Sequence, residues 1–423
     1  MSDDVKIDEV LYMNNYVTYV KDTEGIVWAW GSNDNYQIGP NTTEGPIYTP
    51  YCWNVEVDKF YIEYFDGYYH SDSNRIYDCY AVFVIDKDGV VWSSGYGGYS
   101  SAWSYGLAGK TYSQLGKVGN SANMGRIVDL TVSDDCCYAL NEDGQLWVWG
   151  ANSFGALGYP TSMYTVFSNG YYKFNAVTSP VCLTNTQGVF YHKTVHKVVD
   201  LYGYSDANRF DVYQAGPAYV LVQFTDGTAV YMGDDDRYVN SNGRDLYRSK
   251  TEPYPTPNNV TIDGMIVETY YANSRRVYIR TDNGKIYQNS SYTGVTDITR
   301  PEYEGKTLVE LFGPGSRVPT VETTTFDNET HTITYTSGST EKTFIYPSNI
   351  TAKKVYIDNP TTSYEQNRTI YIIDENNDIW IKGNNSGIGE FTNEFICLTT
   401  KGFVSDEVWD TIRGRWNLIE RKY

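Results

Sequence analysis

The stretch YALNEDGQLWVWGANSFGALG (residues 138–158) decides the fold that the sequence predicts. It contains two apolar runs separated by Asp143-Gly144, and it ends in a loop punctuated by glycine. Glycine adopts positive φ without steric cost and aspartate tolerates it, so the dipeptide predicts a two-residue turn. Apolar residues on both sides recur with the period of two that is typical of strands. The stretch therefore predicts a β-hairpin.

The same pattern recurs along the chain: a turn residue with positive φ, an aromatic residue three positions later, and a closing glycine after three more. Two copies depart from it, because Val230 replaces the aromatic residue in one and Ser290 replaces the closing glycine in another. A seventh, degenerate copy is expected to turn at Asp327-Asn328. The six clear copies begin at Gly25, Gly89, Gly144, Gly227, Gly284 and Asn377.

Two further segments accompany these hairpins. A head segment of two apolar residues and an acid precedes several of them, and a trailing segment with a cysteine follows some. The repeated acids occupy a constant place in the repeat, which favours a structural role such as bonding loop amides or capping a turn. The head segments are Ile127–Leu130, Val198–Leu201, Ile266–Thr269 and Leu308–Leu311, with the acids Asp129, Asp200, Glu268 and Glu310; the trailing segments are Pro50–Trp53, Pro180–Leu183 and Phe395–Leu398.

A head strand, a hairpin and a trailing strand make about four strands per unit. Four-stranded units repeated about seven times predict an all-β fold, a single β-propeller of about seven four-stranded blades that occupies residues 1–423 as one domain. In the tail, residues 403–423, Val408–Thr411 resembles another head segment, so the tail is expected to be a ring-closing strand or a docking tail. The approximate blades are 7–53, 54–125, 126–195, 196–263, 264–305, 306–350 and 351–402.

The segments DGQLWVWGANSFGALG (143–158), EGIVWAWGSNDNYQIG (24–39), DGVVWSSG (88–95) and SQLG (113–116) carry a resemblance. With their DG turn, tryptophan and closing L-G, they resemble the regulator of chromosome condensation repeat family. The resemblance implies a propeller and a protein partner more than a small molecule. It does not transfer one function, because similar propellers serve different partners.

Composition limits the function classes. The formal net charge of −19 disfavours binding to nucleic acid or to an anionic membrane surface. The acidic start Met1-Ser2-Asp3-Asp4 and the lack of a long apolar run predict no signal peptide and no membrane insertion, hence synthesis in the cytoplasm. The six cysteines are expected to be reduced and structural, with Cys52, Cys182 and Cys397 buried.

Catalytic and metal-binding motifs are weak. His192 and His196 have helical metal-ligand spacing but lie in a strand and loop context. Asp234-Asp235-Asp236 departs from the calcium-loop pattern and is expected to be solvated. No nucleophile elbow, P-loop or dinucleotide fingerprint is present in the sequence. The chain is therefore expected to be no enzyme and to need no cofactor or metal.

Aromatic residues in loops rich in glycine and serine are the exception. Such residues present a large contact area at low entropic cost, as in binding surfaces. The alternative is that they pack on their own blades or fill a contact between subunits. By contrast, Trp28, Trp92, Trp147 and Trp380 share one repeat position and are expected to form core between blades. The binding-surface candidates are Tyr96, Tyr99, Trp103, Tyr105, Tyr171 and Tyr172.

These features predict a non-catalytic protein-binding propeller. Composition favours a structural, decoration or attachment component of a large assembly such as a phage or virus particle, into which the protein would be incorporated. The alternatives are a propeller that acts as a guanine-nucleotide exchange factor, an enzyme-inhibitor propeller, and a glycan-binding module for receptor recognition.

Overall fold

The computed structural model describes the parts of the chain that carry the repeats. The structural statements below refer to these residues: 5–13, 17–33, 37–38, 47–70, 75–95, 116–118, 123–133, 136–151, 157–158, 164–166, 172–174, 176–185, 188–201, 219–233, 258–272, 276–290, 294–312, 323–337, 340–358, 368–385 and 390–399.

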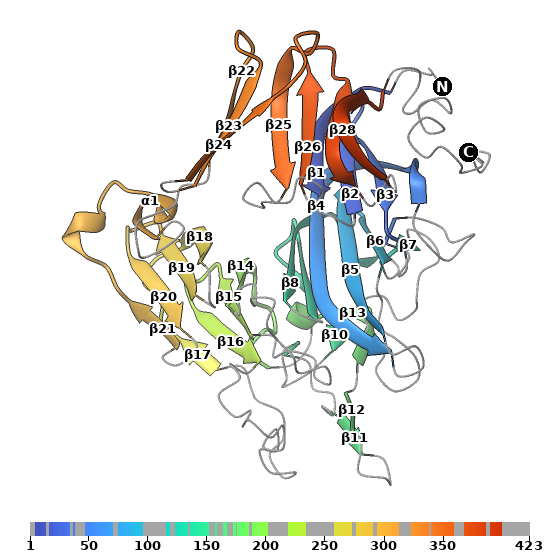
Figure 1. The fold of residues 1–423 in the computed structure, drawn as a ribbon. Helices are drawn as coiled ribbons and strands as arrows, with labels where there is room; N and C mark the ends of the chain where they lie inside the picture. Colours follow the sequence, from blue (N-terminus) through green and yellow to red (C-terminus); the bar gives the residue numbers. More distant parts are fainter. Residues whose placement is uncertain are drawn as a thin grey trace. The chain divides into compact units, whose positions relative to one another are not determined.

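The described residues form antiparallel sheets joined by short turns (Figure 1). They divide into two compact units, which are described separately. The first contains residues 1–62, 113–115 and 318–423, and the second contains residues 63–112 and 116–317.

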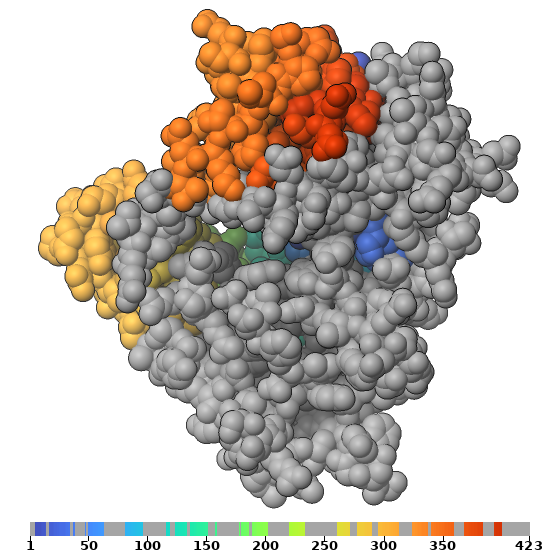
Figure 2. Space-filling view, in the orientation of Figure 1, coloured from blue at the N-terminus to red at the C-terminus, as the bar shows by residue number. Residues whose placement is uncertain are grey.

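The first unit holds three sheets. In sheet A, β1 (Ile7–Met13), β2 (Val17–Asp22), β3 (Ile26–Gly31) and the start of β4 (Ile47–His70) pair in chain order. Sheet G has β22 (Thr323–Asp327), β23 (Thr332–Ser337) and β24 (Thr340–Ile345). Sheet H has β25 (Ala352–Asp358), β26 (Thr369–Asp374), β27 (Ile379–Asn385) and β28 (Glu390–Cys397). The orange and red surfaces of sheets G and H adjoin in Figure 2.

The second unit holds the sheets of the central part of the chain. Strand β4 continues into sheet B with β5 (Arg75–Asp86), β6 (Val91–Gly95) and β7 (Gly116–Lys117). Sheet C has β8 (Ile127–Ser133), β9 (Cys136–Asn141), β10 (Leu146–Ala151) and β13 (Ala176–Cys182), and a small hairpin, sheet D, has β11 (Tyr164–Val166) and β12 (Tyr172–Phe174).

Sheets E and F complete this unit. Sheet E has β14 (Val195–Asp200), β15 (Tyr219–Phe224), β16 (Ala229–Gly233) and β17 (Asn258–Val260). Sheet F has β18 (Ile266–Ala272), β19 (Arg276–Thr281), β20 (Ile286–Ser290) and β21 (Gly294–Asp297). The helices are η3 (Leu183–Asn185), η4 (Pro301–Tyr303) and α1 (Leu308–Phe312).

The repeated hairpins are present, but their turns are longer than predicted. In the reference copy the Asn141 N–H bonds to the Gln145 carbonyl and the Gly144 N–H bonds to the Asn141 carbonyl. The loop therefore has three residues, a type I turn followed by Gly144 with φ +75°. Asn377 has φ +58° in the last copy, so asparagine takes the place of the turn glycine as predicted.

Four of the described turns also join their sheet to the next one along the chain. In these turns the carbonyl of the residue with positive φ accepts a hydrogen bond from the strand that begins the next sheet. Gly89 accepts from Ile127 at 2.9 Å and Gly144 accepts from Val195 at 2.8 Å. Asn377 accepts from Ile7 at 2.8 Å, so the last sheet of the sequence is linked to the first in the same way.

The apolar core lies between neighbouring sheets. Sheets A and H share a cluster that includes Ile7, Trp30, Tyr371 and Ile379, each fully buried. Sheets C and E share a second cluster around Tyr138, Leu146 and Val222. A middle strand such as β9, buried at every position, contributes side chains to both of its faces. This packing explains why single hairpins recur: each buries its apolar side only against a neighbour.

One predicted head segment is wrong. Leu308–Leu311 forms the helix α1, not a strand. Thr307 and Glu310 form a capping box, because the Thr307 N–H donates to Glu310 at 2.7 Å and the Glu310 N–H donates to the Thr307 hydroxyl at 3.2 Å. Buried Leu308 packs beside Tyr278, and Phe312 stacks on Tyr278 with ring centroids 3.9 Å apart. Sheet G consequently has three strands among the described residues, not the four predicted for 306–350.

The remaining degenerate hairpin is confirmed. Strands β22 and β23 pair across a turn that follows Asp327, where His331 has φ +53°. At the predicted boundary between residues 53 and 54, the chain continues through one strand, β4, and Asn54 has φ +53°. No helix in the described ranges is long and apolar enough to cross a membrane. The predicted fold class, an all-β propeller built from four-stranded antiparallel sheets, is confirmed, although the number of blades is not established.

Candidate functional site

The first strand of a sheet, its head strand, carries a charged side chain at one constant position. Each head strand begins with a register shift, and the residue just after it is charged. In sheet E this residue is Lys197, so Asp200 lies three positions further along and was aligned wrongly with Asp129. The charged residues are Glu9, Asp129, Lys197, Glu268 and Lys354.

These charges link head strands to their neighbours. Within the second unit, the Lys197 ammonium lies 2.8 Å from the Asp129 carboxylate, across sheets C and E. Glu268 accepts from Arg280 at 3.0 Å and from the backbone N–H of Leu308 at 2.9 Å, which fixes the start of α1 on sheet F. The structural role predicted for the acids agrees with these contacts for Asp129 and Glu268.

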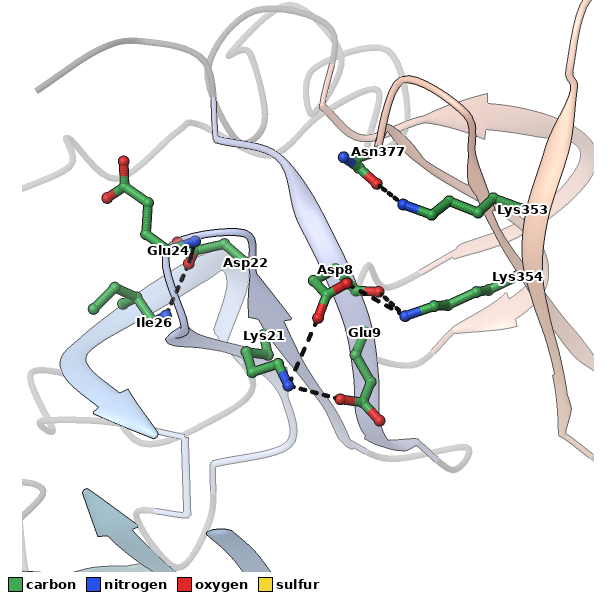
Figure 3. A network of polar contacts seen from close by, with 9 residues as sticks. All are labelled: Asp8, Glu9, Lys21, Asp22, Glu24, Ile26, Lys353, Lys354 and Asn377. Carbon is green, nitrogen blue, oxygen red and sulfur yellow. Dashed lines mark hydrogen bonds and ion pairs between the residues drawn. The ribbon is translucent and has the colours of Figure 1, made fainter. Parts of the chain in front are cut away.

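The most extended of these networks joins sheets A and H (Figure 3). Lys354 on β25 donates to the Asp8 backbone oxygen at 2.7 Å and lies 3.3 Å from its carboxylate. Lys21 donates to Glu9 at 2.8 Å and lies 3.7 Å from Asp8. The hydrogen bond to Glu9 raises the pKa of Lys21, against the opposing effect of partial burial. The Asp8 carboxylate therefore lies near one lysine from sheet A and one from sheet H.

Beside these contacts, in the upper part of Figure 3, Lys353 donates to the Asn377 side chain at 2.7 Å. Lys6 bonds to Asp378 at 2.8 Å. Lys353 is exposed and the other groups are half-buried. Ion pairs in contact with solvent contribute about 0–1 kcal/mol each. The network therefore holds two sheets in register, and it offers no arrangement of groups suited to acid–base chemistry.

A second recurring device lies at the hairpin turns. Asp22 ends β2, and one of its oxygens accepts from the backbone N–H groups of Glu24 and Ile26, at 3.0 and 2.8 Å. Its other oxygen accepts from the Trp28 indole at 2.8 Å. Asp86 bonds Trp92 in the same way at 2.7 Å, and Asp374 bonds Trp380 at 2.9 Å. The carboxylate satisfies turn amides and holds the tryptophan side chain over the hairpin.

Sheet C departs from this device. Asn141 stands where the others have aspartate; its oxygen accepts from Gln145 at 2.8 Å, and its amide donates to Met124 at 2.9 Å. The Trp147 indole nitrogen is buried and has no hydrogen-bond partner in the described part of the chain. The spacing D-x-x-G-x-x-W carried this signal in the sequence, and the prediction used only the glycine and the tryptophan. The repeat tryptophans are half-buried, whereas Trp30 and Trp149 are the fully buried ones.

The turns also present exposed acids at one end of the sheets. In the second unit, Asp88 belongs to the turn of sheet B and Glu142 and Asp143 belong to the turn of sheet C. In the first unit, Glu24 and Glu375 are placed alike. Because the turn carbonyls bond to the next head strand, neighbouring tips lie at the same end of adjacent sheets within each unit. Here these exposed carboxylates are called the acidic turn tips.

The two histidines of the HKTVH segment have separate contacts. His192, with φ +58°, lies against the Tyr191 ring with centroids 3.8 Å apart. A ring nitrogen of His196 is 2.9 Å from the Ile266 carbonyl and joins sheets E and F. In the ranges given above, no three His, Cys, Asp or Glu side chains are grouped so that they could hold a metal ion. Asp234–Asp236 lie outside the described residues.

The aromatic residues predicted to form a binding surface are not tested. Tyr96, Tyr99, Trp103, Tyr105 and Tyr171 lie outside the described residues, as does the tail 403–423. The backbone of Tyr172 begins β12, opposite Val166 of β11. The structure neither brings these residues together nor separates them.

The cysteines of the trailing segments do share a place in the fold. Cys52, Cys182 and Cys397 pair with Trp28, Trp147 and Trp380 across neighbouring strands. Cys182 and Cys397 are buried, whereas Cys52 is half-buried. Burial raises the pKa of Cys52 and of Cys397, which keeps both thiols protonated near neutral pH.

Comparison with known proteins gives one limited sequence match. No family model matches the chain. RUG3, a mitochondrial RCC1 domain-containing protein of Arabidopsis thaliana, is 26% identical over 149 residues. The match covers 34% of this chain and 29% of RUG3, so it spans less than a third of that relative.

Two solved structures are similar to this chain at low sequence identity. Human WBSCR16 is 14% identical, with a TM-score of 0.41, over 91% of this chain and 80% of that one. Prp20p of Saccharomyces cerevisiae, studied for its binding to Gsp1p and histones, is also 14% identical, with a TM-score of 0.40, over 70% of this chain and 64% of that one. The RUG3 match and the four-stranded sheets themselves make this chain similar to RCC1-domain proteins, with an RCC1-like β-propeller architecture.

Proposed function

We propose that this protein is a non-catalytic, protein-binding propeller and that its acidic turn tips contact a basic surface of the partner. The observation that supports this is the repetition of exposed carboxylates at equivalent turns, such as Glu24, Asp88, Asp143 and Glu375. They belong to a chain of formal net charge −19, in which 52 acidic residues outnumber 33 lysine and arginine residues. Rows of one charge steer and orient an oppositely charged partner.

The proposed role follows from the rigidity of the turns. The tips of sheets A, B and H are each held by a carboxylate that bonds two turn amides, and the tip of sheet C is held by the side chain of Asn141. A backbone bond also joins each of these four turns to the strand that begins the next sheet. Charges on fixed backbone lose less conformational freedom on binding than charges on long loops. The tips are therefore suited to recognising a fixed pattern of lysine and arginine residues.

Charge neutralisation at the tips tests this proposal. The variant Asp88→Asn, Glu142→Gln, Asp143→Asn removes three charges from two adjacent turns. Binding to core histones, used as a basic protein probe, is expected to weaken roughly tenfold at low salt, with most of the loss in the association rate. The effect should shrink as salt screens the charges.

A matched control removes three exposed charges from elsewhere: Glu304→Gln, Glu341→Gln and Glu394→Gln. This control should bind as the parent does. Equal weakening by both variants would show that only net charge matters, and no weakening by the first would remove the tips from the binding surface.

A nucleotide exchange role is the second candidate, because the repeat resemblance includes exchange factors. A nucleotide-release assay with small GTPases tests it. If the variant with neutralised tips still accelerates nucleotide release, a different surface of the protein carries the exchange activity. Three further proposals come from the sequence: incorporation into a virus particle from composition, enzyme inhibition from similarity to other propellers, and glycan recognition from the aromatic loops. Mass spectrometry of purified particles, enzyme assays and a glycan array test them in turn.

A further inference from the structure

Among the described residues, sheet G has no head strand, whereas sheet H of the same unit begins with β25. Within the described residues β22 pairs on one side only, with β23. Strand β22 is a first hairpin arm, because the side chain of Asn328 in its turn bonds the backbone N–H of Ala352, the first residue of the next head strand, at 2.7 Å. In sheets A, C, E, F and H, the first arm pairs with the second arm on one edge and with a head strand on the other.

The predicted head segment before β22 does not supply this strand. The residues at the expected place, Leu308–Phe312, form α1 and pack on sheet F. Ten residues remain before β22, and they include Pro314 and Pro319. Proline has no N–H for a ladder and is disfavoured within paired strands. The free edge of β22 therefore needs an occupant from elsewhere, because unpaired edges are a liability for aggregation.

The tail, residues 403–423, contains a segment with the sequence pattern of a head strand. The five observed head strands have an apolar residue at the first position and a charged residue two positions later, as in Ile266 and Glu268. Val408-Trp409-Asp410-Thr411 repeats this order. The head position of sheet A, next along the chain after sheet H, is already occupied by β1.

The tail also leaves the structure at the correct end of the sheets. Thr399 follows β28, and its hydroxyl bonds Asp378 beside the turn of sheet H at 2.7 Å. Head strands begin at this end, as the bond from Ile7 to Asn377 shows. The nine residues from Thr399 to Val408 reach up to about 30 Å when extended. Sheet G is the neighbour of sheet H, through β22 and β25.

We propose that residues 408–412 pair with β22 as the missing head strand of sheet G. In sheet A, Ile7 lies opposite Asp22, Glu9 opposite Lys21 and Val10 opposite Val20. The same register places Val408 opposite Asp327, Asp410 opposite Phe326 and Thr411 opposite Thr325. The tail thus closes an internal sheet, and the ring itself is joined by the direct contact between sheets A and H.

Hydrogen exchange of backbone amides tests this pairing. The chain ending at Gly402 is expected to lose protection in β22, at least tenfold, while β2 of sheet A keeps its protection. A synthetic peptide of residues 403–415 should restore the protection of β22. Unchanged protection of β22 after truncation would overturn the proposal, as would a loss confined to β1 and β2.

A cysteine pair tests the register in the full chain, independently of truncation. Thr325→Cys with Thr411→Cys should form a disulfide under mild oxidation, because paired strand residues bring Cα atoms within the required distance of about 7 Å. The control pairs Thr411→Cys with Thr343→Cys on β24, the opposite edge of the sheet, and should not link. Peptide mapping distinguishes these bonds from any bond to the native cysteines. Equal linkage in both variants, or none in the first, contradicts the pairing.

Discussion

Removing one buried hydroxyl between sheets A and H tests how these sheets are held together. Tyr371 is fully buried, and its hydroxyl lies 3.1 Å from the hydroxyl of Thr18, which is 1% exposed. The Trp30 ring packs edge-on to it, with centroids 6.3 Å apart. Tyr371→Phe keeps the packing and removes only the hydroxyl. A buried polar group without its partner costs about 1–3 kcal/mol.

The expected loss in unfolding free energy is therefore about 2 kcal/mol, measured by urea unfolding with an unchanged m-value. The double variant Thr18→Val, Tyr371→Phe removes both partners and should recover most of the loss. A single variant within about 0.5 kcal/mol of the parent, or a double variant that costs the sum of both changes, would refute this reasoning.

Sheets B and C contain an equivalent aromatic pair in which the tyrosine is replaced by phenylalanine. Phe83 and Trp149 pack with centroids 6.5 Å apart, at the same 62° angle as Trp30 and Tyr371. Phe83 has no hydroxyl, and the Trp149 indole nitrogen has no partner among the described residues. Phe83→Tyr should therefore raise the unfolding free energy by up to about 1 kcal/mol. A loss would show that the extra oxygen does not fit.

The same tyrosine gives the protein an alkaline sensitivity. Burial raises the pKa of Tyr371 well above its ordinary value, although hydrogen bonds from Thr18 and Trp30 oppose this. A group with a raised folded-state pKa contributes stability below its unfolded pKa of about 10 and loses it as pH rises above that value. Unfolding free energy should fall less steeply above pH 10 in Tyr371→Phe than in the parent.

The remaining predictions concern the turns and α1. Asp374→Ala should cost about 2–3 kcal/mol in urea unfolding because two turn amides and the Trp380 indole lose their acceptor, whereas Asp374→Asn should cost less; equal costs would contradict the separate roles of the two oxygens. Gly383→Ala should be far more destabilising than Gly227→Ala, because φ is positive at both but only at Gly383 would a Cβ meet a backbone oxygen, at 1.8 Å; similar melting temperatures would refute this. The hydrogen bond from Thr307 lowers the pKa of Glu310 below 4.5, so amide protection in α1 should be lost as pH falls below that value, and constant protection would exclude the capping box.

Much of the fold was predictable because the repeat is local. A glycine in the turn, a tryptophan three residues later and alternating apolar residues are readable within 20 residues, and each hairpin so predicted exists. The predicted turn length was wrong because a glycine with positive φ at position 144 is compatible with both a two-residue and a three-residue loop. The Asp22–Trp28 contact was missed although its spacing recurs in the sequence.

The predictions that failed depended on competition between local signals. Leu308–Leu311 has the apolar pattern of a head segment, but the capping box of Thr307 and Glu310 favours a helix. Asp200 was aligned with Asp129 because both are acids that follow two apolar residues. Only the register of the paired strands shows that Lys197 is the residue equivalent to Asp129. The predicted binding-surface aromatics are not among these failures: apart from the backbone of Tyr172 in β12, they lie outside the described residues and stay a prediction.

Carbodiimide cross-linking with peptide mapping tests the central claim most directly, since it joins an amine to a carboxylate only when the two are in contact. If the sheets follow one another until the last adjoins the first, Lys6 will be joined to Asp378 and Lys354 to Asp8, pairs separated by 372 and 346 positions in the sequence. If both lysines are joined only to acids near them in the sequence, sheets A and H are not neighbours and the account is contradicted.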